Sequence, residues 1–106
     1  MIAEIVKNNL GSIKEACKKY KVISLYLFGS ATTKDFTPQS DLDFLVEYSK
    51  DAEGLPEYPF DYFDFLFLLE NITGKKIDLV VKEAVRNSFF KKTIEEQKEL
   101  IYEQRN

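Results

Sequence analysis

Two aspartates separated by one residue, Asp41 and Asp43, follow a Gly29-Ser30 pair after a gap of ten residues. Side chains alternate between the two faces of a strand, so we expect both carboxylates on one face and Leu42 in a core. Paired carboxylates beside a turn rich in backbone N–H groups can hold a divalent metal over a phosphate. The spacing therefore indicates metal-assisted chemistry at a phosphate group.

A third carboxylate, Asp78, interrupts the apolar run 77–81. A charge inside an apolar strand is costly unless it is paired or bound to a metal, and Asp43 is subject to the same penalty. We predict that Asp41, Asp43 and Asp78 share one metal site. The alternative is that they are solvated carboxylates at strand edges.

The Gly-Ser turn has structural interpretations as well. Gly29 suits a tight turn whether or not the protein is active. Ser30 suits the cap of a following helix, and it also suits an anion-binding turn together with the backbone N–H groups that follow Gly29.

The elements that must position these residues follow from the apolar pattern. We predict an amphipathic helix over 2–20, interrupted at Gly11 and with Cys17 on its buried stripe. A strand at 22–28, a short helix at 30–35 and a strand at 41–47 come next. A polar loop at 49–59, a largely buried helix at 60–71 and a strand at 77–81 follow, and residues 83–103 are predicted to be mostly helical. The order indicates an α/β fold with a small sheet flanked by helices.

The bulk composition limits the possible functions. The 106 residues are expected to form one domain, 1–106, with 44% hydrophobic and 31% charged residues. A net charge of −3 argues against an extensive nucleic-acid-binding surface. No signal peptide or membrane span is evident, so we expect a cytoplasmic protein without a membrane partner.

The rare residue types restrict the chemistry further. The chain has no histidine, so a metal here must be held by oxygen atoms, which favours Mg²⁺ or Mn²⁺ over zinc. The single cysteine, Cys17, cannot form an intramolecular disulfide and suits a reducing compartment. We interpret it as a small core residue.

The chain resembles the nucleotidyltransferase superfamily that includes DNA polymerase beta and kanamycin nucleotidyltransferase. More narrowly, it resembles the minimal nucleotidyltransferases (MNT), the antitoxins of HEPN/MNT toxin–antitoxin pairs. The resemblance covers nearly the whole chain, and it is carried by Leu27-Phe28, Gly29, Ser30, Ser40, Asp41, Asp43, Asp78 and the closing stretch Ile101-Tyr102-Glu103.

This resemblance implies a polymerase beta-like fold with a small mixed sheet, and Mg²⁺-dependent transfer of AMP from ATP to a tyrosine hydroxyl of a cognate HEPN protein. Two Mg²⁺ ions are implied with the nucleotide. Asp41, Asp43 and Asp78 are then the catalytic and metal-binding residues, and Asp78 assists deprotonation of the acceptor. Gly29 and Ser30 bind the nucleotide. Many relatives carry an Arg-containing, Gly-ending segment after Gly-Ser, where this chain has residues 31–34, and Lys34 is the candidate phosphate-facing cation.

Two other functions stay open from the sequence. The departure at residues 31–34 favours a catalytically weak or inactive antitoxin that acts by binding its partner. Its partner surface would be the aromatic segment 58–67, although we expect core packing to account for most of those rings. A sugar transferase that uses its Asp-x-Asp is a weaker alternative, because such enzymes need a larger domain. A homo-oligomer is compatible with all three.

Overall fold

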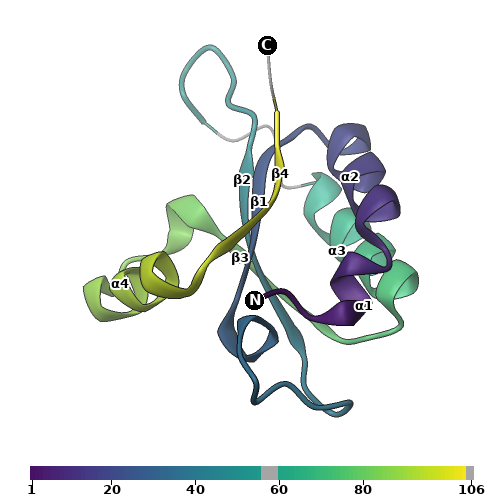
Figure 1. Cartoon of the computed structure of the whole chain (residues 1–106). Helices are drawn as coiled ribbons and strands as arrows, with labels where there is room; N and C mark the ends of the chain where they lie inside the picture. Colours follow the sequence, from purple (N-terminus) through teal and green to yellow (C-terminus); the bar gives the residue numbers. More distant parts are fainter. Residues whose placement is uncertain (56–59, 105–106) are drawn as a thin grey trace.

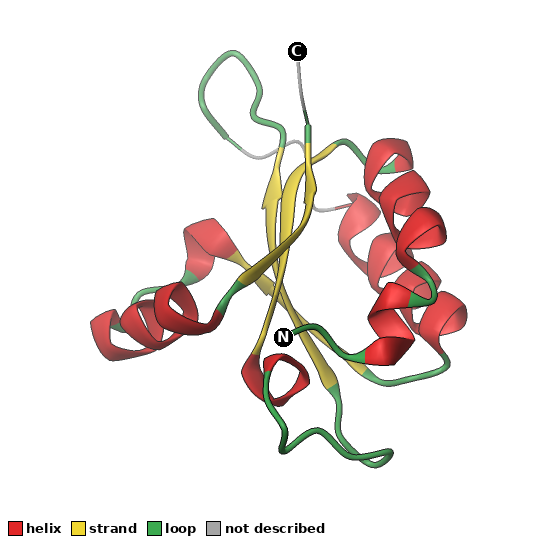
Figure 2. Cartoon of the chain, in the orientation of Figure 1, coloured by secondary structure: helices red, strands yellow, loops and turns green. Residues whose placement is uncertain are grey.

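The computed structural model describes residues 1–55 and 60–104, and these form a small α/β structure. The elements are, in order, α1 (Glu4–Lys7), α2 (Leu10–Lys19), β1 (Val22–Phe28), the 3-10 turn η1 (Gly29–Thr32), β2 (Leu42–Tyr48), α3 (Phe60–Thr73), β3 (Ile77–Val81), the 3-10 turn η2 (Lys82–Ala84), α4 (Ser88–Gln97) and β4 (Glu99–Glu103). The fold is that of a small mixed sheet flanked by helices, as predicted (Figure 2).

The sheet has the strand order β3-β2-β1-β4. Strand β1 runs antiparallel to both β2 and β4, whereas β2 and β3 are parallel and are connected through α3. Figure 1 shows α1, α2 and α3 on one face of the sheet and α4 on the other. Because side chains alternate along each strand, the two faces carry different residues of the same strands.

The face under α1–α3 holds the main core. Leu42 is fully buried there, as predicted, together with Phe44 of the same strand and Phe65 of α3. The opposite face holds a smaller cluster beneath α4, in which the buried members are Phe28, Leu45, Val85 and Ile94. The main core therefore fixes the sheet, and the α4 face is left with less apolar packing.

The predicted N-terminal helix over 2–20 is in fact two helices. The break falls at residues 8 and 9, and Gly11 lies inside α2 rather than at the interruption. The Asn9 amide Nδ2 donates to the Ile5 carbonyl oxygen at 2.7 Å, and such side-chain bonds compete with the helical ladder. The buried stripe is still correct, since Ile13 and Cys17 are fully buried.

The prediction of helix through 83–103 is wrong at its end. Helix α4 stops at Gln97, and residues Glu99–Glu103 form β4. The run Leu100-Ile101-Tyr102 is apolar on successive positions, which fits a helix or a strand equally by periodicity. The open edge of β1 decides between them by supplying backbone partners, and Ile101 then packs into the main core.

Smaller differences concern the ends of elements. Strand β2 begins at Leu42, so Asp41 lies just before it, and η1 is shorter than the helix expected at 30–35. Helix α3 runs to Thr73, two residues beyond the expected end. Of the predicted loop at 49–59, residues 56–59 lie outside the described part of the chain.

Cys17 is a core residue, as interpreted from the sequence. It is a free cysteine without solvent exposure, and burial raises the pKa of its thiol to about 12. Within residues 1–55 and 60–104, no helix has the length and apolar character needed to cross a membrane.

Candidate active site

The Gly-Ser turn follows β1 directly and lies against the second aspartate of the pair. Gly29 has a φ of +73°, a conformation that glycine adopts at little cost. Phe28 is the register partner of Asp43 across β1 and β2, and a Cβ atom at position 29 would overlap the Asp43 carboxylate. Gly29 is thus required twice, for the backbone angle and for the space that the carboxylate occupies.

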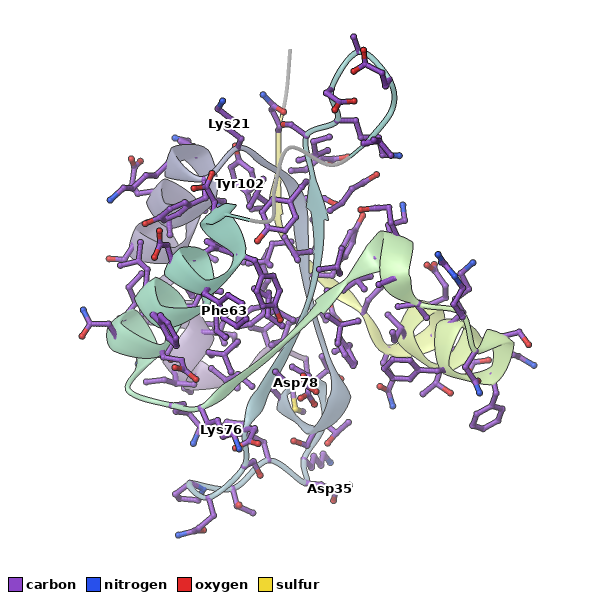
Figure 3. The ribbon with its side chains drawn as sticks, turned by 180° about the vertical axis from the view of Figure 1, so that it is seen from behind. Lys21, Asp35, Phe63, Lys76, Asp78 and Tyr102 are labelled. Atoms are coloured by element: carbon purple, nitrogen blue, oxygen red, sulfur yellow. The ribbon has the colours of Figure 1, made fainter. Side chains whose placement is uncertain are left out.

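Asp43 and Asp78 stand side by side in the sheet. They are register partners in the parallel pair β2–β3, so their side chains project to the same face, the one that α4 covers. Asp43 is half-buried, and Asp78 is exposed on β3 (Figure 3). Asp41 is exposed immediately before β2.

The electrostatics at Asp43 reflect this crowding. Burial, then the charge of Asp78 and then that of Asp41 raise the pKa of Asp43 from 3.8 to about 6. Within the described residues, no donor forms a hydrogen bond to its carboxylate. Burial and the charge of Asp78 also raise the pKa of Tyr62, whose hydroxyl donates to the Leu79 carbonyl oxygen at 2.6 Å.

A second acidic side chain on the same face of β2 has a different environment. Glu47 accepts a hydrogen bond from Ser24 Oγ at 3.2 Å, and its Oε2 lies 3.7 Å from Nζ of Lys82. Asp43 has like charges where Glu47 has a cation and a hydroxyl donor. No cation of the described residues therefore offsets the negative charge of Asp43, the aspartate next to the Gly29–Ser30 turn.

The residues present fit a magnesium ion shared with a phosphate ligand. The three aspartates predicted to share one metal site are not gathered as a set: in the described part of the chain, no group of three or more Asp, Glu, Cys or His side chains is placed to hold a metal by itself, and the sheet register pairs only Asp43 with Asp78. Mg²⁺ usually takes one or two carboxylates, and the rest of its ligands are waters and substrate phosphate oxygens. The register pair Asp43–Asp78, half-buried on one side and without donors at Asp43, matches that requirement.

The turn itself is held by residues that the sequence analysis did not single out. Thr32 Oγ1 donates to the Gly29 carbonyl oxygen at 2.7 Å, and Thr33 Oγ1 donates to the Ser30 carbonyl oxygen at 2.9 Å. Threonine hydroxyls often donate to a backbone carbonyl three residues earlier, so the two threonines that follow Gly29-Ser30 could have indicated these bonds from the sequence. Gln97 of α4 also contacts the turn, by accepting a hydrogen bond from the Gly29 N–H at 3.2 Å, and no local pattern indicates this contact.

The other two predicted nucleotide-binding residues lie on or beside this turn. Ser30 lies inside η1 and is half-buried; the residue that caps η1 is Phe28, and it makes no side-chain capping bond. In the described residues, the Ser30 hydroxyl has no hydrogen-bond partner, so a capping role does not account for it. Lys34 is exposed two residues after η1.

The aromatic segment divides between core and surface. Phe65 is buried and Tyr62 is half-buried, whereas Phe63 and Phe67 are 60% and 58% exposed, with ring centroids 6.2 Å apart. Figure 3 labels Phe63 on α3. Positions 58 and 59 lie outside the described residues.

Known proteins similar to this chain were found by sequence and by structure. Residues 11–101 match the nucleotidyltransferase domain family. "Putative protein adenylyltransferase MJ1379" of Methanocaldococcus jannaschii is 39% identical over 101 residues, which are 95% of this chain and 93% of that protein.

Solved structures also share the fold, and two of them illustrate the match. The structure of a "putative minimal nucleotidyltransferase" aligns with a TM-score of 0.72 and 22% identity over 96% of both chains. An MNT antitoxin in complex with the tri-AMPylated HEPN toxin of Shewanella oneidensis aligns with a TM-score of 0.63 and 17% identity over 92% of this chain and 72% of the other. With the family match spanning the turn and all three aspartates, the chain belongs to the nucleotidyltransferase domain family.

Proposed function

We propose that the chain is a Mg²⁺-dependent adenylyltransferase that moves AMP from ATP to a tyrosine hydroxyl of a partner HEPN protein, and that it acts as the antitoxin of that partner. The observation that carries the proposal is the uncompensated pair Asp43–Asp78, which lies beside a turn with a free serine hydroxyl. A protein keeps such a charge conflict where a ligand relieves it.

Each residue has a defined role in this proposal. Asp41, Asp43 and Asp78 hold Mg²⁺ together with the triphosphate oxygens. Bound there, Mg²⁺ would neutralise the charge that accumulates on the phosphate oxygens during transfer. The Ser30 hydroxyl and the amides of the turn bind the triphosphate, and Lys34 offers a cation at its outer side.

The reaction is a displacement at the α-phosphorus of ATP. The acceptor oxygen forms a bond to that phosphorus, the bond to the β-phosphate oxygen breaks, and pyrophosphate leaves. Asp78 accepts the proton of the acceptor hydroxyl, because it is exposed at the edge strand β3 where another protein can approach. The described residues house a turn and three carboxylates but little else, so the acceptor is presented by the partner.

The partner is proposed from two observations. A solved structural relative is an MNT antitoxin bound to an AMPylated HEPN toxin. In this chain, Phe63 and Phe67 form an exposed apolar pair on α3. Helix α3 is in contact with β3, the strand that carries Asp78. Exposed apolar side chains of this size are common at protein contacts.

The test is transfer of label from α-labelled ATP in the presence of Mg²⁺ and a HEPN protein from the same genome. We expect label on a tyrosine of the partner with the wild type, and at least a 100-fold loss of rate in the Asp41→Asn/Asp43→Asn double variant and in Asp78→Asn. Glu47→Gln is the matched control, because it removes a carboxylate from the same face of the same strand. Its transfer rate should be close to that of the wild type.

A second candidate function is inhibition of the partner by binding alone. The exposed Phe63–Phe67 pair and the absence of an arginine in residues 29–34 favour it. If the Asp41→Asn/Asp43→Asn protein silences the partner as well as the wild type does, and neither leaves a label, the catalytic proposal fails and the binding function replaces it.

A further inference from the structure

The turn Gly29–Thr32 is fixed by hydrogen bonds to each of its first three carbonyl oxygens. The Gly29 oxygen accepts from Thr32 Oγ1, and the Ser30 oxygen accepts from both the N–H and Oγ1 of Thr33, each at 2.9 Å. The Ala31 oxygen accepts from the Ala3 N–H at 3.0 Å. The electronegative edge of the turn is therefore occupied by donors, which leaves its N–H edge as the side that can face an anion.

The first amide of the turn is held by the C-terminal helix. The Gly29 N–H donates to Gln97 Oε1 at 3.2 Å, across 68 residues of sequence. Strands β1 and β4 pair Leu27 with Glu99, so extending this antiparallel ladder by two positions would place Gln97 opposite Gly29. Helix α4 ends there instead, and the Gln97 side chain supplies the acceptor that a strand backbone would have supplied.

Helix α4 can serve as a fixed support because it is anchored near both ends. Asn87 Oδ1 accepts from the Phe90 N–H at 2.9 Å and caps the start of the helix. Ile94 is buried in the cluster that contains Phe28, and the Phe90 ring lies 6.0 Å from the Phe28 ring. Phe28 immediately precedes Gly29, so the packing of α4 and the bond from Gln97 act on adjacent residues.

We infer that Gln97 is a positioning residue for the phosphate-binding turn. Gly29 has a φ of +73° and no side chain to restrict rotation of its peptide groups, so its orientation depends on the bonds at either end. Gln97 fixes the Gly29 N–H by accepting its hydrogen bond, and Thr32 fixes the Gly29 carbonyl by donating to it. Together they hold the following amides and the Ser30 hydroxyl in the orientation in which they meet the triphosphate. The inference rests on the proposed function, since it concerns the same site.

The test uses Gln97→Met, which keeps the length of the side chain and removes the acceptor. Calorimetry in Mg²⁺ buffer measures the affinity for ATP and for inorganic tripolyphosphate, and NMR measures hydrogen exchange at the Gly29 amide. We expect both affinities to fall by the same factor, about 3- to 10-fold, because one hydrogen bond is lost. Exchange at Gly29 should become faster while the melting temperature stays within about 3 °C of the wild type.

Two variants control this experiment. Gln104→Met makes the same chemical change at an exposed glutamine just after the end of β4, and it should leave both readouts unchanged. Gln97→Glu keeps an acceptor oxygen at the same distance, so it should preserve slow exchange at Gly29. If Gln97→Met does not fold, Gln97→Ala takes its place with the same expected direction.

The outcomes separate this inference from the proposed function. If the wild type binds MgATP and Gln97→Met binds it equally well, the inference is overturned and the proposed function stands. If exchange at Gly29 is unchanged in Gln97→Met, the inference is overturned as well. A wild type that binds neither MgATP nor tripolyphosphate overturns the proposed function, and the inference with it.

Discussion

The two ends of the parallel pair β2–β3 present a direct comparison on one face of one sheet. Near the start of the pair, Asp43 is in register with Asp78. Four residues further along the chain from each aspartate, Glu47 of β2 faces Lys82, the first residue of η2 after β3, with Oε2 and Nζ 3.7 Å apart. The carboxylate at one end is charge-compensated and the carboxylate at the other is not, although Asp43 and Glu47 project from the same face of β2.

The difference indicates where the fold gives up stability. At the Glu47 end, a hydroxyl and a cation satisfy the carboxylate. At the Asp43 end, burial and two like charges raise the pKa, and Gly29 leaves just enough room for the carboxylate. A sequence selected for stability alone would place a cation at position 78. The aspartate at position 78 is therefore consistent with the ligand-binding role that we propose for it above.

The largest expected effect comes from giving Asp43 a neighbouring cation, as Glu47 already has. Asp78→Lys would place a cation beside Asp43, as Lys82 stands beside Glu47. We expect transfer to the partner to fall by about 10²–10³-fold, while the free energy of unfolding in metal-free buffer rises by up to about 1 kcal/mol. Labelled-ATP assays and urea unfolding measure the two changes. A variant that loses stability together with activity would show that the pair is not a site of charge conflict.

The next effect concerns the room at Gly29. Gly29→Ala places a side chain in the left-handed region, at about 1–2 kcal/mol, and it also drives a Cβ atom into the Asp43 carboxylate. Gly74→Ala is the matched control, because Gly74 has a φ of +68° and a Cβ atom there would have no neighbour within 4 Å. Urea unfolding should show a larger loss for Gly29→Ala than for Gly74→Ala. Adding Asp43→Ala should remove the excess, and equal losses in the two single variants would contradict the overlap.

The smallest effect is the pH dependence of stability. The pKa of Asp43 is raised from 3.8 to about 6, so its protonated form is favoured by folding. The stabilisation is fully present below about pH 3.8 and is lost as the pH rises through about 6. In metal-free buffer, the Asp43→Asn protein should therefore gain stability over the wild type above pH 6 and gain little near pH 4.

The other end of the strand pair serves as the control for this profile. Glu47→Gln removes the partner of Lys82, so at about pH 8 it should lose roughly 0.2–1 kcal/mol where Asp43→Asn gains. Unfolding in urea across the pH range measures both variants. If Asp43→Asn loses stability at about pH 8, as Glu47→Gln does, the two ends are equivalent and the comparison fails.

Local sequence was sufficient for the elements whose apolar pattern is unambiguous. The strand around Leu25, the burial of Leu42 and the helix that buries Phe65 were all predicted, because alternation and composition there have one interpretation. The Gly-Ser turn and the three aspartates were singled out from spacing, from charges that interrupt apolar strands and from the family resemblance, and the register then placed Asp43 beside Asp78. The break before α2 and strand β4 were missed, because an asparagine side chain and the open edge of β1 decided them.

The sequence by itself determined the residue types of the site, their order and the family to which the chain belongs. Only the tertiary structure decided that Asp43 stands beside Asp78 and Glu47 beside Lys82, since strand direction and register are set by the packing of α3 across the sheet. It also decided that Gln97 reaches Gly29 across 68 residues. The physical reason is that these contacts join segments far apart in the chain, and no local pattern of side chains encodes which edge or which register brings them together.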